Sequence, residues 1–265
     1  MGDSTCKILF IGDIIGSPGR LAVRELLPKL IGAHNPDAVI ANGENAAGGF
    51  GITPVIYEEL ISLEIDVVTS GNHIWDRKEI PDFLKFGGHM LIRPANYPEG
   101  APGEGHTVFE TTTGVKIGVV NLCGRVFMGN LDCPFRAGME LVEKLRKQTP
   151  VILVDMHAET TSEKAAMGWY LDGLASAVIG THTHVHTADE RILTNGTAYI
   201  TDAGMTGPVN SVIGMKKEAI LERFLTQMPV RFEVAAKDVE LQGVLVTVDA
   251  ATGKALKIER VKHAL

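Results

Sequence analysis

Three short apolar runs in the first third of the chain each stop at polar residues. The runs span 7–13, 37–42 and 66–69, and their nearly continuous apolar character predicts buried strands. Between them, apolar residues recur at helical spacing after Ser17-Pro18-Gly19 and again from about 53 to 63. Strands that alternate with helices in this way predict a parallel sheet covered by helices.

The rest of the chain mixes hairpins with further strands and helices. Apolar runs at 106–110 and 116–120 flank a Thr-rich turn and predict an antiparallel hairpin. Buried strands at 151–155 and 177–180 alternate with helices at about 136–147 and 162–171, and two more hairpins turn at Asn195-Gly196 and at 251–253. No repeat, low-complexity tract or long linker interrupts this order, which predicts one domain over 1–265.

Polar residues follow each of the three early strands. Asp13 ends the first, the segment 42–45 (Asn-Gly-Glu-Asn) ends the second, and Asn72 with His73 follows the third. In open parallel sheets, ligands bind beyond the carboxyl ends of the strands. The sequence therefore predicts a functional site at this edge.

The densest chemical signal is the segment Gly180-Thr-His-Thr-His184. Residues two apart in an extended segment point to the same side, so His182 and His184 are expected to present their imidazoles to one site. Neutral imidazole is the commonest side-chain metal ligand, although an exposed His-X-His pair also occurs as plain polar decoration. His186 continues the alternation and is expected at the rim.

Oxygen-bearing residues extend this candidate metal site. The Glu44 carboxylate is of a type that bridges two cations about 3.5–4 Å apart, and Asn45 adds an amide beside it. Asn72 offers a carbonyl oxygen, and the neighbouring His73 is placed to protonate a leaving oxygen. Asp13 is alternatively a helix cap, and the Asn-Gly-Glu-Asn segment alternatively a plain turn. His157, just after the strand 151–155, completes the set.

Charge and cysteine content narrow the functional classes. The 265 residues contain 25 Lys plus Arg and 32 Asp plus Glu, a net charge of −7. No global positive field attracts nucleic acid or anionic lipid, so no stable nucleic-acid complex is expected. Three cysteines without Cys-X-X-Cys spacing argue against a disulfide framework. Without a secretory signal or an apolar run of about 18 residues, we expect a cytoplasmic protein with no membrane contact.

The candidate residues form an ordered series along the chain. This series resembles the five blocks of the calcineurin-like metallophosphoesterases, which read Asp-X-His, Gly-Asp-X-X-Asp, Gly-Asn-His-Asp/Glu, a single His, and Gly-His-X-His. In chain order, the matching positions are Asp13, Glu44 with Asn45, Asn72 with His73, His157, and His182 with His184.

Three departures from those blocks are informative. Ile15 stands where the first block has His, Glu44 where the second has its bridging Asp, and Ile74 where the third has an acidic residue. The chain with these departures resembles one bacterial branch, the YmdB-like phosphodiesterases. That similarity runs nearly end to end and rests on the segments 10–20, 42–45, 91–98, 180–185 and 200–208.

The resemblance implies an α/β fold, a four-layer α/β/β/α sandwich of two mixed sheets, with two metal ions at the strand ends. Iron or manganese is expected, and zinc suits the same ligands. In the implied assignment, Glu44 bridges both ions. Metal one takes Asp13, Glu44, Asn45 and His184, and metal two takes Glu44, Asn72, His157 and His182.

The implied reaction is hydrolysis of 2′,3′-cyclic nucleotides to 3′-nucleotides by a hydroxide held between the two cations. His73, which is not a ligand, would protonate the departing sugar oxygen. Arg93, Asn96 and the Thr206-Gly207 loop are expected to touch substrate. Two alternatives stay open. The protein is either a phosphoesterase that acts on a nucleic-acid end or a phosphoprotein, or a regulatory protein that binds metal or nucleotide and has weak turnover. Ile15, in place of the usual His of the first block, favours the regulatory protein. Hairpin edges at 239–261 favour a homo-oligomer.

Overall fold

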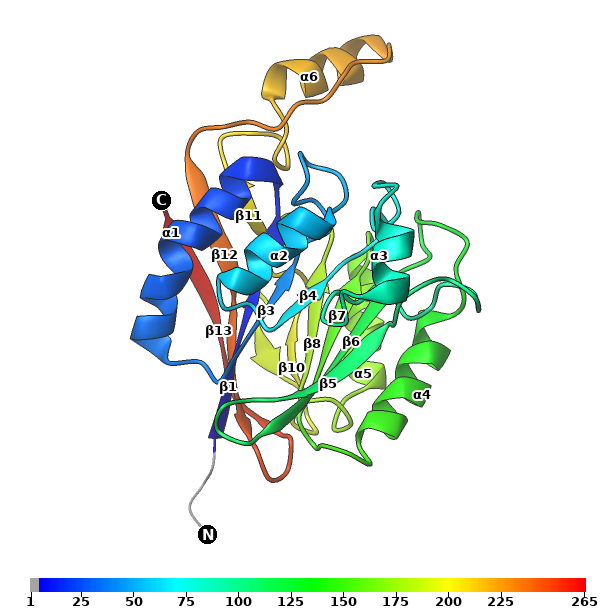
Figure 1. Ribbon diagram of the computed structural model, residues 1–265, viewed down its shortest axis with the longest axis vertical. Helices are drawn as coiled ribbons and strands as arrows, with labels where there is room; N and C mark the ends of the chain where they lie inside the picture. Colours follow the sequence, from blue (N-terminus) through cyan, green and yellow to red (C-terminus); the bar gives the residue numbers. More distant parts are fainter. Residues whose placement is uncertain (1–4) are drawn as a thin grey trace.

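In the computed structural model, which describes residues 5–265, two β-sheets pack face to face and helices cover their outer surfaces (Figure 1). The first sheet has the order β2-β11-β12-β1-β3-β4, with β13 paired to β12. Its strands are β1 (Thr5–Ile11), β2 (Asp13–Ile14), β3 (Ala38–Asn42), β4 (Val67–Thr69), β11 (Met205–Pro208), β12 (Val239–Asp249) and β13 (Ala255–Ala264).

The second sheet has the order β5-β6-β7-β8-β10-β9. Its strands are β5 (His106–Glu110), β6 (Lys116–Cys123), β7 (Ile152–His157), β8 (Ala177–Thr181), β9 (Arg191–Ile192) and β10 (Ala198–Ile200). The helices are α1 (Gly16–His34), α2 (Pro54–Ser62), α3 (Ile80–Phe86), α4 (Pro134–Leu145), α5 (Thr161–Tyr170) and α6 (Lys217–Thr226).

The alternation of side chains along the strands divides the apolar core into three layers. On β1, Leu9 packs into the cluster beneath α1 and α2, whereas Phe10 packs between the two sheets. On β7, Val154 packs with α4 and α5, whereas Leu153 faces the other sheet. Three cores need four layers, so the predicted α/β/β/α sandwich is confirmed.

The parallel pairings bring the strand ends together. β1, β3 and β4 pair in parallel, as do β6, β7, β8 and β10. The antiparallel partners β12 and β5 make both sheets mixed. The predicted hairpins at 106–120, at Asn195-Gly196 and at 251–253 all form. Since parallel strands end at one edge, the polar residues that follow them share that edge.

The first strand and two helices differ from expectation. The predicted run 7–13 breaks at Gly12, whose N–H donates to the carbonyl of Gln242, and Asp13 begins a separate short strand beside β11. The sequence pattern does not predict the short helix α3 or the helix α6. Helix α6 stands away from the body in Figure 1 and leaves apolar residues exposed, so it lacks the regular buried stripe that marks a packed helix.

None of the helices between residues 5 and 265 is long and apolar enough to cross a lipid bilayer. The N-terminal stretch in which we expect no secretory signal begins with residues 1–4, which lie outside the described residues. Cys6, Cys123 and Cys133 are all free.

Candidate metal centre

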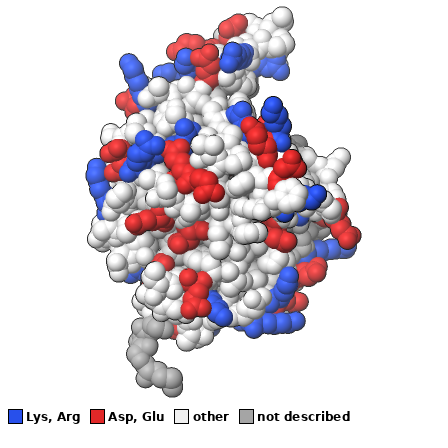
Figure 2. Space-filling model, viewed as in Figure 1, with Lys and Arg blue, Asp and Glu red and all other residues white. Residues whose placement is uncertain are grey.

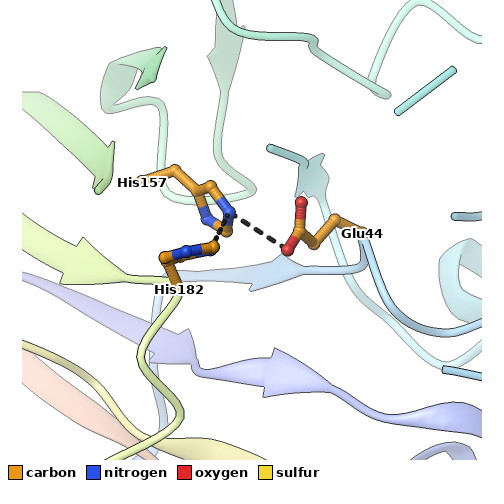
Figure 3. Close-up of side chains that lie close together, drawn as sticks. All are labelled: Glu44, His157 and His182. Carbon is orange, nitrogen blue, oxygen red and sulfur yellow. Dashed lines mark hydrogen bonds and ion pairs between the residues drawn. The ribbon is translucent and has the colours of Figure 1, made fainter. Parts of the chain in front are cut away.

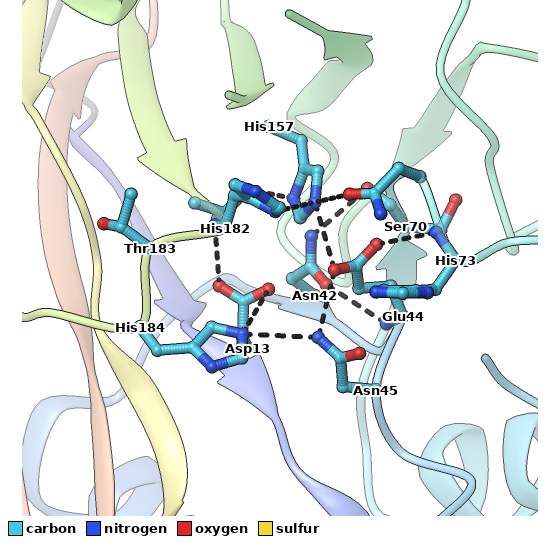
Figure 4. Close-up of polar contacts among 12 residues, drawn as sticks. Asp13, Asn42, Glu44, Asn45, Ser70, His73, His157, His182, Thr183 and His184 are labelled. Atoms are coloured by element: carbon cyan, nitrogen blue, oxygen red, sulfur yellow. Dashed lines mark hydrogen bonds and ion pairs between the residues drawn. The ribbon is translucent and has the colours of Figure 1, made fainter. Parts of the chain in front are cut away.

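The seven predicted ligands converge at the carboxyl ends of the strands, where the two sheets meet. Figure 4 labels Asp13, Glu44, Asn45, His157, His182 and His184, and the seventh, Asn72, lies 3.1 Å from His157. Asp13 begins β2, Glu44 and Asn45 follow β3, and Asn72 follows β4. From the second sheet, His157 ends β7, and His182 and His184 follow β8. Each sheet therefore contributes part of the site.

One group of donors surrounds the Nε2 atom of His157. Glu44 Oε1 lies 3.0 Å from it, and Asn72 Oδ1 and His182 Nδ1 each lie 3.1 Å away. Figure 3 shows Glu44 and His182 on either side of the His157 ring. A ring nitrogen carries at most one proton, so it cannot satisfy three lone-pair atoms. A cation bound among these four atoms would satisfy all of them.

Thr181 and Asp155 orient the His157 ring from behind. The Thr181 hydroxyl donates to Asp155 Oδ1 at 2.7 Å, and its oxygen lies 2.8 Å from His157 Nδ1. Because that hydroxyl has only one proton, Nδ1–H must donate to it. The arrangement leaves the Nε2 lone pair for a metal whenever the ring is neutral.

Asp155 also joins the two sheets beneath the site. Its Oδ2 accepts hydrogen bonds from Thr69 Oγ1 at 2.5 Å and from Asn42 Nδ2 at 3.1 Å, both on the first sheet. The carboxyl is fully buried, and burial raises its pKa. Asp155 precedes His157 by two residues on β7, so the two side chains lie on the same side of that strand.

The second group of donors centres on Asp13. Its buried Oδ2 accepts the N–H of His182 at 3.1 Å, while Oδ1 has no hydrogen-bond partner among residues 5–265. His184 Nε2 lies 3.8 Å from that Oδ1 and 3.3 Å from the side-chain nitrogen of Asn45. Rotating the Asn45 amide by half a turn exchanges this nitrogen for an oxygen. An unpartnered buried carboxylate oxygen beside an imidazole fits a second cation.

Glu44 connects the two groups. Its Oε1 lies 3.0 Å from both His157 Nε2 and Asn45 Nδ2, and its Oε2 accepts the backbone N–H of His73 at 3.2 Å. Gly71 allows this packing, since a Cβ there would clash with Glu44 and His157. A single oxygen of Glu44 thus contacts a member of each donor group, which is the position of a bridging ligand.

Burial and close contact shift the pKa values of several side chains in the metal-free site. Burial alone would raise the pKa of Glu44, but the charge of His157 lowers it to about 2. Burial alone would lower the pKa of His157, but the Glu44 carboxylate raises it to about 9. Burial beside His157 lowers the pKa of His182 to about 3. Burial raises the pKa of Asp13 to about 6, against the attraction of His184. A neighbouring histidine thus stabilises the ionised form of each carboxylate, His157 for Glu44 and His184 for Asp13.

The segment that carries His182 and His184 is not extended, in contrast to the expectation from its alternating pattern. Both residues have positive φ, 96° and 61°, and the chain turns after Thr181. Such backbone costs roughly 1–3 kcal/mol per residue and persists only where its surroundings enforce it. Here the Thr183 N–H and hydroxyl donate to Asp202 Oδ2 at 3.0 and 2.7 Å, and this fixes the turn.

Each of these histidines has one nitrogen engaged outside the cluster. His182 Nε2 pairs with Glu159 Oε2 at 3.0 Å, which leaves Nδ1 facing His157. His184 Nδ1 donates to the carbonyl of Ile213 at 3.0 Å, which leaves Nε2 facing Asp13. Outer partners of this kind orient metal-binding imidazoles. His186, expected at the rim, does not line the pocket beside the site.

His73 lies beside the cluster rather than in it. Its Nδ1 is 2.7 Å from Asp76 Oδ2, and its ring packs edge-on against Phe50, with ring centroids 5.2 Å apart. Sequence reasoning missed Asp76, although an acid three residues after His73 was the available signal. The carboxylate holds the proton on Nδ1 and leaves Nε2 for a substrate.

A pocket of about 410 Å³ opens beside both donor groups. Its lining combines polar and apolar side chains. The polar lining consists of Glu44, Asn45, His73, Glu159, His182, Thr183 and His184, and the apolar lining of Phe50, Ile213, Met215, Ile220 and Phe232, with Gly49 between. A larger hollow of about 680 Å³ over 125–135 and 162–163 is lined by none of the candidate ligands, so the smaller pocket is the one that adjoins the candidate metal centre.

The three residues that we expect to touch substrate each bond to backbone, Arg93 and Asn96 in loops and Thr206 in β11. The Arg93 guanidinium donates to three backbone carbonyls between residues 94 and 102. Asn96 is buried and donates to the carbonyl of Cys123, and Thr206 is buried and bonds to the backbone of Gln242. None of them lines the pocket. Polar residues in loops often satisfy nearby backbone groups in this way, and contact of these residues with substrate stays a prediction.

Comparison with known proteins gives a consistent result. A family model described as "YmdB-like protein" matches residues 9–261. The chain is 54% identical over 255 residues to the Bacillus subtilis protein named 2′,3′-cyclic-nucleotide 2′-phosphodiesterase, covering 96% of each chain.

Two solved structures have the same fold. A crystal structure of a hypothetical protein from Thermus thermophilus superposes with a TM-score of 0.90 at 42% identity, covering 97% of this chain and 99% of that one. A crystal structure of a Mycoplasma pneumoniae protein, described as a novel phosphatase, superposes with a TM-score of 0.91 at 36% identity, covering 98% and 94%.

Proposed function

Because the chain belongs to the YmdB-like protein family, we propose that it is a metal-dependent phosphodiesterase that converts 2′,3′-cyclic nucleotides to 3′-nucleotides. The observation that carries this proposal is the convergence of seven side chains with oxygen and nitrogen donors from both sheets, among them a buried oxygen of Asp13 that has no hydrogen-bond partner among residues 5–265. The name of the Bacillus subtilis relative supports the choice of substrate.

We assign the seven donors to two metal ions that share Glu44. Iron or manganese is the proposed metal, and zinc suits the same mixture of carboxylate, amide and imidazole. When bound, the metals supply Lewis-acid activation of water and neutralise charge on the phosphoryl group. Asp13, Glu44, Asn45 and His184 would hold one ion, and Glu44, Asn72, His157 and His182 the other.

His73 is the proposed proton donor to the departing sugar oxygen. It lines the same pocket as Glu44 but belongs to neither donor group, and Asp76 fixes its proton-bearing Nδ1. Its Nε2 is therefore the atom that would carry the transferred proton. The Phe50 ring packs against His73 and limits its movement.

The alternatives are less well supported. Ile15, which favours the regulatory reading, is fully buried and packs near Gly207 and Gly214 in the core, and four donors remain for each ion without it. For a nucleic-acid end, a basic surface is expected. On the face shown in Figure 2, acidic and basic side chains are instead interspersed, and the net charge is −7.

A substrate panel tests the proposed activity. The protein is stripped of metal, reloaded with manganese or ferrous iron, and assayed on 2′,3′-cyclic, 3′,5′-cyclic and linear phosphodiesters. We expect the highest kcat/KM for the 2′,3′-cyclic compounds. Equal rates across the panel would contradict the proposed selectivity, and binding without hydrolysis of any substrate would favour the regulatory reading.

We also propose that the protein acts in the cytoplasm and self-associates. Apolar side chains on α6, namely Leu221, Phe224 and Leu225, are 55%, 71% and 84% exposed, which is typical of a contact surface. Sedimentation equilibrium distinguishes a monomer of 28.5 kDa from a homo-oligomer.

A further inference from the structure

The pocket has an apolar wall that phosphodiester chemistry does not require. Its members are the side chains of Phe50, Ile213, Met215, Ile220 and Phe232, which we call the apolar wall. We propose that the apolar wall binds the nucleobase of the cyclic nucleotide by stacking and apolar contact, and that it does not discriminate among the bases. This inference rests on the proposed function and concerns the part of the substrate that does not react.

The two kinds of side chain in the pocket match the two kinds of group in a nucleotide. The anionic phosphate requires cations and a proton donor, and the polar lining includes the proposed donor His73 and four of the proposed metal ligands, Glu44, Asn45, His182 and His184. The flat base is the remaining large group, and its faces are apolar. A pocket of about 410 Å³ is in the range of small-molecule sites, which are mostly apolar with a few placed polar groups.

Two excursions of the chain build the apolar wall. Phe50 lies in the glycine-rich loop after β3, between Gly49 and Gly51, which have φ of 95° and 74°. Arg77 braces this loop, since its Nε donates to the carbonyl of Phe50 at 3.0 Å. The other four members come from 213–232, which includes α6.

The two excursions pack on each other. The side chain of Met215 lies against Gly49 so closely that a Cβ on the glycine would clash with it. Met215 also forms isolated β-bridges with Val212 and Val234, which close the base of the 213–232 excursion. The apolar wall is therefore built into the fold, although α6 extends away from the body.

Ile213 ties the apolar wall to the metal-site residues. Its carbonyl accepts the Nδ1–H of His184 at 3.0 Å, while its side chain lines the pocket. A shift of the wall would thus move a proposed metal ligand. This contact places the apolar wall next to the proposed metal ligands.

The chemistry of the apolar wall predicts weak discrimination among bases. Its five side chains carry no nitrogen or oxygen, so they cannot pair with the edge of a base. Apolar pockets discriminate only weakly between ligands of similar shape, and an aromatic side chain can stack on any of the bases. We expect kcat/KM for the four 2′,3′-cyclic nucleotides to agree within about tenfold, with purines favoured.

A substrate without a base tests the apolar wall separately from the polar lining. For the metal-loaded wild type, replacing 2′,3′-cyclic AMP by methyl riboside 2,3-cyclic phosphate is expected to lower kcat/KM by about tenfold or more. Phe232→Ala should lower kcat/KM for the nucleotide by about tenfold and leave the base-free substrate unchanged, and Phe232→Tyr should restore the rate. The matched control is Phe86→Ala, because Phe86 is 77% exposed at the end of α3 and lies outside the pocket. Equal losses of Phe232→Ala on both substrates would overturn the proposal.

Product binding gives a second readout that needs neither metal nor turnover. By calorimetry on the metal-free protein, adenosine 3′-monophosphate is expected to bind at least about tenfold more tightly than ribose 3-phosphate, and Phe232→Ala should remove this difference. Equal affinity of the wild type for the two compounds would overturn the proposal. If the loaded wild type hydrolysed neither cyclic substrate, the proposed function would fail, and the affinity ratio would still decide for or against the apolar wall.

Discussion

Lys164 Nζ lies 2.7 Å from Asp202 Oδ2, and both side chains are fully buried. The same oxygen accepts the N–H and the hydroxyl of Thr183, which stands between His182 and His184. The ion pair therefore supports the strained turn that directs two imidazoles into the site. Gly180 allows it, since a Cβ there would meet Lys164.

Breaking this pair should destabilise the protein and loosen the turn. Asp202→Asn leaves the Lys164 charge buried without a partner, which costs about 3–5 kcal/mol in comparable proteins. We expect urea unfolding to report a loss of that order, with weaker metal binding. The control is Glu233→Gln, which breaks an exposed pair with Lys216 and should leave the unfolding midpoint unchanged. An Asp202→Asn variant with the stability and metal binding of the wild type would refute the role assigned to the pair.

The Thr181 hydroxyl should matter for metal affinity beyond its effect on stability. Thr181→Val removes the acceptor for His157 Nδ1–H and the donor to Asp155, so the ring is no longer held with Nε2 available. Loss of such an outer partner typically lowers metal affinity about 10- to 100-fold. A competition titration against a chelating dye measures it. Thr181→Ser should restore the affinity, and Thr107→Val, at a hydroxyl remote from the site, should not change it.

His73 and Glu44 should separate turnover from metal content. His73→Ala keeps every proposed ligand, so we expect both metals to stay bound while the rate falls about 10²- to 10⁴-fold, the range for a general acid. Glu44→Ala removes the shared carboxylate and should lose metal first. Metal analysis by mass spectrometry beside a turnover assay measures both effects. Loss of metal from His73→Ala would contradict the role proposed for it.

Asp76 acts through His73 in this account. Asp76→Asn keeps a group of the same size but removes the charge that holds the proton on His73 Nδ1. We expect a smaller loss of rate than for His73→Ala, with kcat lowered more than KM is changed, and unchanged metal content. A kcat equal to that of the wild type would exclude the pairing as a determinant of the proton donor.

The pH dependence follows from His157. In the metal-free protein its pKa is raised from 6.5 to about 9, chiefly by Glu44 against the opposing effect of burial. The pair with Glu44 therefore stabilises the metal-free fold fully below pH 6.5, and this contribution is lost as the pH rises through about 9. Metal binding must displace the same proton, so metal affinity should rise over this interval. Calorimetry in buffers of different ionisation enthalpy measures the released proton. An affinity independent of pH between 6.5 and about 9 would contradict it.

The strand ends and their polar residues could be predicted because both signals are local. Short apolar runs mark β1, β3 and β4, and Asp13, Glu44 and His73 follow them directly in the sequence. Parallel pairing then brings these residues to one edge. The order of the blocks supplied the link to His157 and to the His-X-His segment.

The supporting contacts could not be predicted because they cross the fold. Asp202 lies 19 residues from Thr183 and 38 from Lys164, and Asp155 meets Thr69 on the other sheet across 86 residues. No periodicity encodes such pairs. The expected extended geometry at His182 failed for the same reason, since the positive φ there depends on Asp202.

The apolar wall could not be predicted from the sequence either. Its members come from the glycine-rich loop and from 213–232, and neither segment has the regular spacing of a packed helix or strand. Their shared pocket appears only when the two excursions are brought together in the fold.

The identity of the product tests the central claim most directly. The metal-reconstituted protein is incubated with 2′,3′-cyclic AMP, and the phosphorus NMR spectrum is followed over time. The account predicts a single product, adenosine 3′-monophosphate, whose formation stops when a chelator removes the metal. Accumulation of the 2′-monophosphate, or no hydrolysis with either manganese or ferrous iron, would contradict it.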